Sequence, residues 1–181
     1  MGLFGVEAGI AALHEYRGQP IQYVKLGGVA EYFFDDIATI GGFGGVLIPT
    51  ESSPPRSLAT LQNGFYAGGH ATFYANDNWA LSGSVKAYHS EQTSSDIELL
   101  SLSTMGTLRY LTPMSGVELF FSGGYRLCEQ DGPFDIFYPE NGAVFLAGIK
   151  ANIVGRDGSL LEIDRSNSID TNVWSCFIAS G

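Results

Sequence analysis

The sequence predicts an all-β protein, a closed antiparallel up-and-down (meander) β-barrel of roughly eight to ten strands and of the transmembrane type. Apolar residues recur at every second position, and short turns alternate with longer polar connections. Most of the alternating segments also reach the about 9 to 11 residues that a transmembrane strand needs. Because no shift in composition divides the 181 residues, we expect a single β-barrel domain over residues 1–181.

Ten strands are expected along the chain. Each has alternating apolar and polar positions, as in a strand with one apolar face, and none keeps the spacing of an amphipathic helix. The richness in Gly and aromatic residues, with only 15% charged residues, also favours sheet. The expected strands are residues 2–16, 21–34, 37–48, 64–75, 79–88, 99–111, 116–127, 143–154, 159–164 and 172–179.

The connections between these segments alternate in length. Short turns rich in Asp, Asn, Pro and Gly are expected at residues 35–36, 76–78, 112–115 and 155–158. The other gaps are residues 17–20, which is short, and the longer polar segments 49–63, 89–98, 128–142 and 165–171. This alternation places the long connections at one end of the sheet, as in outer-membrane barrels.

The two faces of each expected strand differ in chemistry. One face is apolar, whereas the other carries about one charge per strand, with basic and acidic residues in near balance. Charges that point into a barrel can pair across its interior, as buried charges must. We therefore predict a lumen charge network made of Glu7, Lys25, Glu31, Lys86, Arg109, Glu118, Arg126, Lys150 and Glu162.

Aromatic residues lie on the apolar faces or near the strand ends. In a membrane barrel such residues contact lipid or form a girdle at the lipid interface. The predicted lipid-facing or girdle residues are Phe65, Phe73, Tyr74, Trp79, Tyr110, Phe121 and Tyr125. Pairs of glycines, such as residues 41–42 and 123–124, are expected to permit strand curvature and close packing.

The hairpin GGHATFYANDNWALSGSVKAY, with its alternation of Gly and aromatic residues and its short Asn/Asp turn, resembles the small porin-like outer-membrane β-barrel proteins of Gram-negative bacteria. The resemblance is one of pattern and covers most of the chain. It implies a bacterial outer-membrane location and the lipid bilayer as partner. Lipopolysaccharide or another envelope protein is the expected partner of the long loops. The chain opens on Met-Gly-Leu-Phe-Gly-Val-Glu, so no signal peptide is expected within it.

Several other functions are not expected. A net charge of −10 with only nine Lys and Arg argues against nucleic-acid binding. His14, His70 and His89 have no ligand spacing, so neither a metal nor a cofactor is predicted. His89 and Ser90 would point to opposite faces of a strand, so we predict no enzyme and no catalytic residue. Cys128 and Cys176 match no metal or redox motif and are interpreted as unpaired, although one disulfide is open to them.

Two functions therefore remain open. The first is an outer-membrane barrel with a structural or narrow-pore role, in which Glu118 faces inward. The second is a soluble lipocalin-like barrel, in which the apolar faces point inward and bind a small apolar ligand. Full exposure of Glu118, Lys86 and Lys150 to bulk solvent outside the barrel would contradict the first function.

Overall fold

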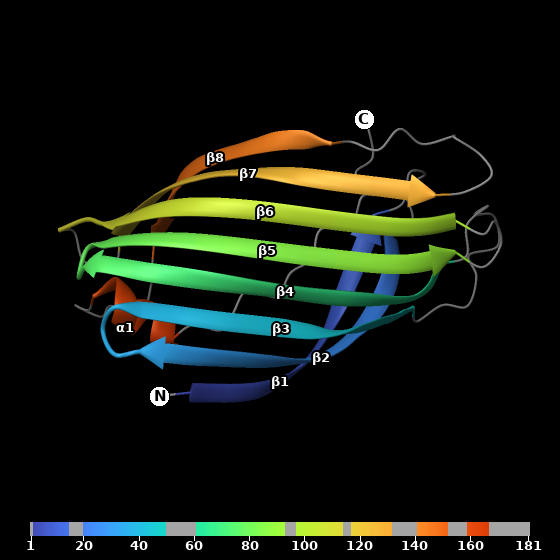
Figure 1. The fold of residues 1–181 in the computed structure, drawn as a ribbon, viewed down its shortest axis with the longest axis horizontal. Coiled ribbons are helices and arrows are strands. Elements are labelled where there is room, and N and C mark those ends of the chain that lie inside the picture. Colours follow the sequence, from blue (N-terminus) through green and yellow to red (C-terminus); the bar gives the residue numbers. More distant parts are fainter. Residues whose placement is uncertain are drawn as a thin grey trace.

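The computed structural model contains eight strands and one short helix (Figure 1). The residues that it describes are 2–14, 20–49, 61–92, 97–113, 117–131, 141–151 and 159–166. The elements are β1 (Gly2–His14), β2 (Pro20–Phe34), β3 (Ala38–Pro49), β4 (Leu61–Asn76), β5 (Trp79–Gln92), β6 (Ile97–Leu111), β7 (Val117–Asp131), β8 (Gly142–Ala151) and α1 (Leu160–Ser166).

The strands form one antiparallel sheet in which every strand pairs with its neighbours in sequence, from β1 to β8. The predicted all-β antiparallel meander is confirmed. The closed barrel is wrong for the part of the chain that the structure describes, because no ladder joins β1 to β8 there and the sheet is open. Alternation and turn chemistry specify which neighbours pair, whereas closure depends on strand tilt and stagger, which the pattern does not contain.

The segment predicted as a ninth strand is instead α1. A short apolar run fits a strand or a helix equally well, and here a capping box decides for the helix. The Glu162 N–H donates to Ser159 Oγ at 3.3 Å, and the Ser159 N–H donates to Glu162 Oε2 at 3.0 Å. The expected tenth strand, residues 172–179, lies outside the described residues.

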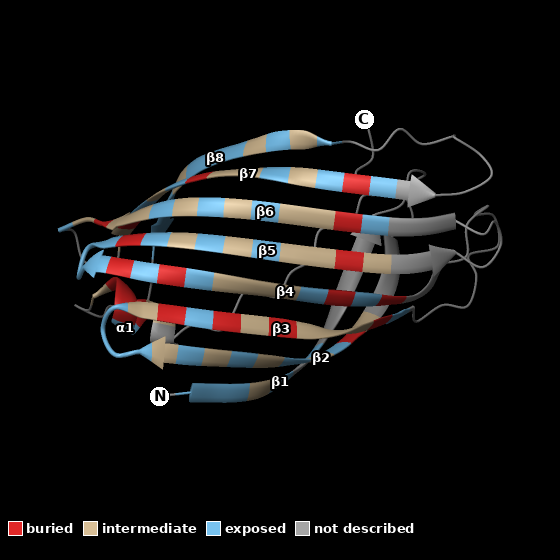
Figure 2. Cartoon of the chain, viewed as in Figure 1, coloured by how far each residue is buried: buried red, intermediate tan, exposed pale blue. Residues whose placement is uncertain are grey.

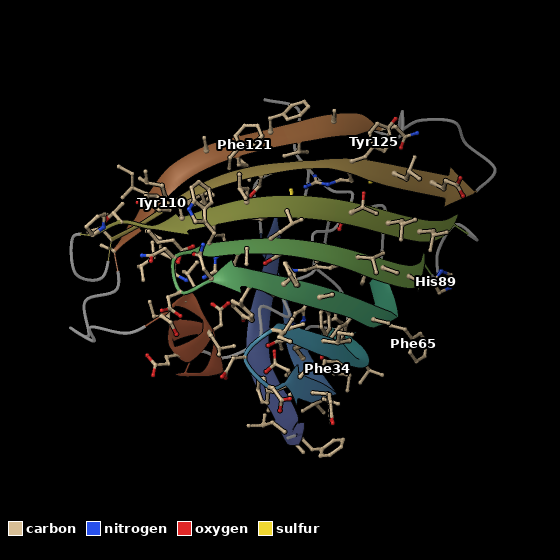
Figure 3. The ribbon with its side chains drawn as sticks, turned by 60° about the vertical axis from the view of Figure 1, so that its left-hand side comes forward. Phe34, Phe65, His89, Tyr110, Phe121 and Tyr125 are labelled. Atoms are coloured by element: carbon tan, nitrogen blue, oxygen red, sulfur yellow. The ribbon has the colours of Figure 1, made fainter. Side chains whose placement is uncertain are left out.

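The sheet is curved, and its two faces are named here by the residues they carry. The outer face carries Phe65, Phe73 and Phe121, and the concave face, against which α1 packs, carries Arg109 and Glu118. Figure 3 shows Phe121 and Tyr125 pointing away from the sheet on the side opposite α1.

Glycine permits the curvature at close strand contacts on the concave face. A Cβ atom added to Gly124 of β7 would collide with the backbone carbonyl oxygen of Thr104 on β6. A Cβ at Gly83, on the outer face of β5, would meet no atom within 4 Å. Gly124 therefore permits the close strand packing that was predicted for glycine pairs such as residues 123–124.

Burial follows the two faces in alternation along the central strands (Figure 2). On the outer face Phe65 is 60% exposed and Phe121 is 56% exposed, whereas Glu118 on the concave face is only 2% exposed. The concave face thus buries polar groups such as Glu118 together with apolar ones such as Leu47 and Tyr66, whereas the outer face exposes large apolar side chains, which water-soluble sheet proteins rarely do over a wide area. One apolar cluster is buried, where α1 meets the sheet, and consists of Tyr74, Ala80, Leu111, Leu160, Leu161 and Ile163.

Candidate functional site: a charged cavity on the concave face

Arg109 lies at the centre of the concave face near α1 and contacts two carboxylates. Its Nε and Nη2 donate to the two oxygens of Glu118 at 2.7 and 3.0 Å. Its Nη1 and Nη2 donate to the two oxygens of Asp164 at 2.6 and 2.8 Å. Both contacts are bidentate, which is the strongest geometry available to a guanidinium and a carboxylate.

Sheet register and helix docking together produce this arrangement. Arg109 lies opposite Phe120 and Leu111 opposite Glu118, so Arg109 and Glu118 are diagonal neighbours on one face of the β6–β7 pair. Asp164 comes from α1, whose Leu160 N–H donates to the Asp77 carbonyl oxygen in the β4–β5 turn at 2.9 Å. The Tyr74 hydroxyl donates to Asp164 Oδ2 at 2.8 Å, which adds a second contact from the sheet to this carboxylate.

A second polar pair bridges three strands. His70 Nε2 of β4 lies 3.1 Å from Glu31 Oε1 of β2, although β3 runs between them. The residue of β3 opposite both is Gly41, and a Cβ there would overlap the His70 imidazole. Glycine at this position therefore lets the imidazole cross β3 and reach the carboxylate.

Hydroxyl groups continue the polar lining across the next strand pairs. Thr72 and Ser82 join β4 to β5 through their hydroxyl oxygens, which are 3.0 Å apart. Thr107 and Ser122 join β6 to β7 in the same way at 2.8 Å. Such cross-strand pairs satisfy buried polar groups without a charge.

These groups surround a cavity of about 310 Å³. Its lining includes Glu31, His70, Lys86, Arg109 and Asp164, together with the hydroxyl groups of Thr72, Ser82 and Thr107. A cavity with this lining can hold water and small polar solutes, because donors and acceptors of both charge signs face it. Among the described residues, no group of three or more His, Cys, Asp or Glu could hold a metal ion.

The residues of the predicted lumen charge network are found in different settings. Lys25 is buried, with its Nζ 4.6 Å from the centre of the Tyr66 ring, and Glu118 is buried beside Arg109. Arg126 and Lys86 are half-buried, whereas Lys150 is exposed on the edge strand β8.

Glu162 and Glu7 are the remaining two members of the predicted network. Glu162 is a correction: it is exposed on α1 and accepts the Ser159 N–H, so it does not lie on a strand. For Glu7, the structure describes the backbone pairing with Gly27 but not the side chain.

Most of the predicted lipid-facing or girdle residues lie on the outer face. Trp79 and Tyr110 are directly opposite on β5 and β6, and their ring centroids are 4.5 Å apart. Exposed side chains on the same face include Phe65, Phe73, Phe121 and Tyr125.

Tyr74 is a correction to this predicted set. It is buried on the concave face, where its hydroxyl reaches Asp164, because its alternation places it with Thr72 rather than with Phe73.

Sequence reasoning did not place Asp164 and His70 in the site. Asp164 was expected in a strand, and its contact with Arg109 exists only because residues 160–166 form a helix that docks on the sheet. His70 was weighed only as a metal ligand. Its position on the polar face of β4, opposite Gly41, was the available signal for a cross-strand contact.

Cys128 is disulfide-bonded, so the interpretation of this residue as an unpaired cysteine is wrong. Cys176, the other cysteine of the chain, lies outside the described residues. A structural disulfide is typical of proteins in oxidising compartments.

The comparisons and the helix content add little about function. Within the described residues, no helix has the length and apolar character needed to cross a membrane. No protein-family model, curated protein or solved structure matches this chain. The chemistry of the two sheet faces is therefore the main indication of function.

Proposed function

We propose that this chain is a bacterial outer-membrane protein whose strands cross the bilayer, with a structural or narrow-pore role. The observation that carries the proposal is the exposed apolar outer face, which includes Phe65, Phe121 and Ile149, opposite a concave face on which the charged residue Glu118 is buried. Lipid can cover such an outer face at no hydrophobic cost, whereas water cannot.

Strand length supports the same proposal. The strands have from 10 residues in β8 to 16 residues in β4. Globular strands average about 5 to 6 residues, whereas membrane-crossing strands need about 9 to 11. Every strand is therefore long enough to cross the hydrocarbon core.

The outer face also carries aromatic residues at both ends of the strands. Trp79 and Tyr110 lie at the turn end of β5 and β6, whereas Phe65 lies toward the long connection that precedes β4, and Tyr125 lies near the middle of β7. Amphipathic aromatic side chains such as Trp79 and Tyr110 at one level of the outer face are typical of an interface of a bilayer.

In a membrane, the backbone N–H and C=O groups on the free edges of β1 and β8 would need hydrogen-bond partners. Unpaired backbone groups cost several kcal/mol each in hydrocarbon. The proposal therefore requires that a further strand pairs with each of these edges in the bilayer. Of the two roles, the structural one is favoured over a pore, because α1 packs across the concave face near the β4–β5 turn.

The location and partners proposed here rest on separate arguments. A disulfide at Cys128 fits the oxidising environment of a bacterial envelope. We propose lipopolysaccharide or another envelope protein as the partner of the long connections, because the strand ends that they join, in β3 and β4, β5 and β6, and β7 and β8, lie at one end of the antiparallel sheet.

The soluble lipocalin-like alternative requires the opposite orientation of the faces. Its apolar positions would line a cavity, and its charges would face water. In the described strands, charged and hydroxyl side chains make up most of the cavity lining, with Phe43 and Met105 as its large apolar members, so the cavity suits a polar solute better than a small apolar ligand.

Partitioning into membranes tests the proposal. The protein is purified with and without detergent and mixed with liposomes, and the mixture is separated by flotation in a density gradient. We expect aggregation without detergent and flotation with the liposomes that resists extraction with carbonate. A monodisperse protein in plain buffer that stays at the bottom of the gradient would overturn the proposal.

A further inference from the structure

We propose that α1 is a latched plug that closes the turn end of the concave cavity against small solutes, with the contact between Asp164 and Arg109 as the latch. This inference rests on the proposed function, because it assigns a state to the polar interior of that membrane protein. Its evidence is independent and comes from how α1 is seated on the sheet.

The seat of α1 is apolar and buried. Leu160 is fully buried, and Leu161 and Ile163 are also buried, against Tyr74, Ala80 and Leu111 of the sheet. A helix of 7 residues is too short to be stable alone in water, since isolated helices need about 12 to 15 residues. The helix therefore depends on its contacts with the sheet.

These contacts lie at the turn end of the strands. The Leu160 N–H of α1 donates to the Asp77 carbonyl in the β4–β5 turn. Leu111, which packs against α1, donates its N–H to the Asn78 carbonyl in the same turn at 2.8 Å. Asp164 lines the cavity, so the polar side of α1 forms its floor. With α1 seated, the turn end of the cavity is covered.

The latch can be removed without leaving a buried cation unpaired. Arg109 uses one edge for Glu118, which lies on the sheet, and its remaining donors for Asp164, which lies on the plug. Loss of Asp164 leaves the contact with Glu118 in place. Release of α1 is therefore a local event, whereas loss of Arg109 would disturb the sheet as well.

Accessibility of a cysteine in the cavity tests the plug. Ser84 of β5 lines the cavity and is half-buried. In a Ser84→Cys background, the rate of modification by a negatively charged methanethiosulfonate reagent is measured in detergent and in proteoliposomes, and the modified residue is identified by peptide mass spectrometry. The variants compared are Asp164→Asn and the control Glu129→Gln, which changes charge equally at an exposed residue of β7.

We expect Asp164→Asn to raise the modification rate at position 84 about tenfold or more, with Glu129→Gln unchanged. Tyr74→Phe removes one hydrogen bond to Asp164 and should give a smaller rise, so it tests the latch even if Asp164→Asn fails to fold. Equal rates in every folded variant would overturn the plug. Flotation with liposomes, scored on the same samples, reports separately on the proposed function.

Discussion

The two faces of the sheet are built from the same strands by the same alternation, yet the outer face exposes apolar side chains whereas the concave face covers polar ones. On the outer face, neighbouring positions such as Phe73, Leu81 and Leu108 are apolar and exposed. On the concave face, Thr72 and Ser82 hydrogen-bond to each other, Arg109 donates to Glu118, and these residues are buried or half-buried. The comparison shows that the strand period separates the two faces, and that the face with the hydrogen-bonded polar groups is the covered one.

The largest effect is expected on the concave face, at Arg109→Met. This change leaves Glu118 and Asp164 close together without their shared cation. Breaking a buried ion pair costs about 3–5 kcal/mol in the free energy of unfolding. Denaturant titration in detergent measures it, with Glu129→Met, at an exposed residue of β7 outside the cavity, as the control.

We expect the control at Glu129 to change the free energy of unfolding by no more than about 0.5 kcal/mol. Equal effects at Arg109 and Glu129 would mean that the concave network does not stabilise the protein. The contrast between the two faces would then lose its energetic basis.

The second effect tests the outer face by a charge at two depths. Val85→Arg places a cation on the outer face near the middle of β5, and Ala75→Arg places one at the turn end of β4. In a bilayer the first should cost about 2–4 kcal/mol and the second about 0–1 kcal/mol. Unfolding in liposomes measures both, and a soluble protein would tolerate Val85→Arg as well as Ala75→Arg.

The third effect compares glycines on the two faces. Gly124→Ala forces a Cβ against the Thr104 carbonyl and should destabilise by about 1–3 kcal/mol, as overpacking does. Gly83→Ala enters open space and should be neutral or stabilising by up to about 1 kcal/mol. Melting temperatures of the two variants check this, and the same loss from both would show that strand curvature does not depend on Gly124.

The smallest effect concerns a hydroxyl pair. Thr107→Val removes the hydrogen bond to Ser122 on the concave face and should cost about 0.5–1.5 kcal/mol. Thr104→Val changes an exposed residue on the outer face of the same strand and should have almost no effect. A loss confined to Thr104→Val in denaturant titration would reverse the assignment of the faces.

Much of the sheet was predictable because its determinants are local. Alternation and turn residues such as Asn76 and Asp77 specify antiparallel neighbours, and eight of the predicted strands appear in the predicted order. The predicted closure of the barrel was wrong for the described strands, because the alternation of apolar and polar residues does not specify strand tilt and stagger. Residues 159–164 were assigned to a strand because a short apolar run is ambiguous, and the capping pair Ser159 and Glu162 was overlooked.

The candidate site was harder to predict than the sheet. The pairing of Arg109 with Glu118 follows from register on one face, so their association could be anticipated from the polar alternation. The contacts of Arg109 with Asp164 and of Tyr74 with Asp164 depend on helix docking, a tertiary event without a signal in strand periodicity.

The central claim is that the outer face contacts lipid, and Trp79 reports on it most directly. Trp79 is 40% exposed on that face, and Trp174→Phe makes it the only tryptophan of the chain. Its fluorescence is measured in liposomes whose lipids carry bromine on the acyl chains or are unmodified. We predict strong quenching by the brominated lipids, with little quenching by aqueous iodide. Quenching by iodide alone would place Trp79 in water and contradict the account.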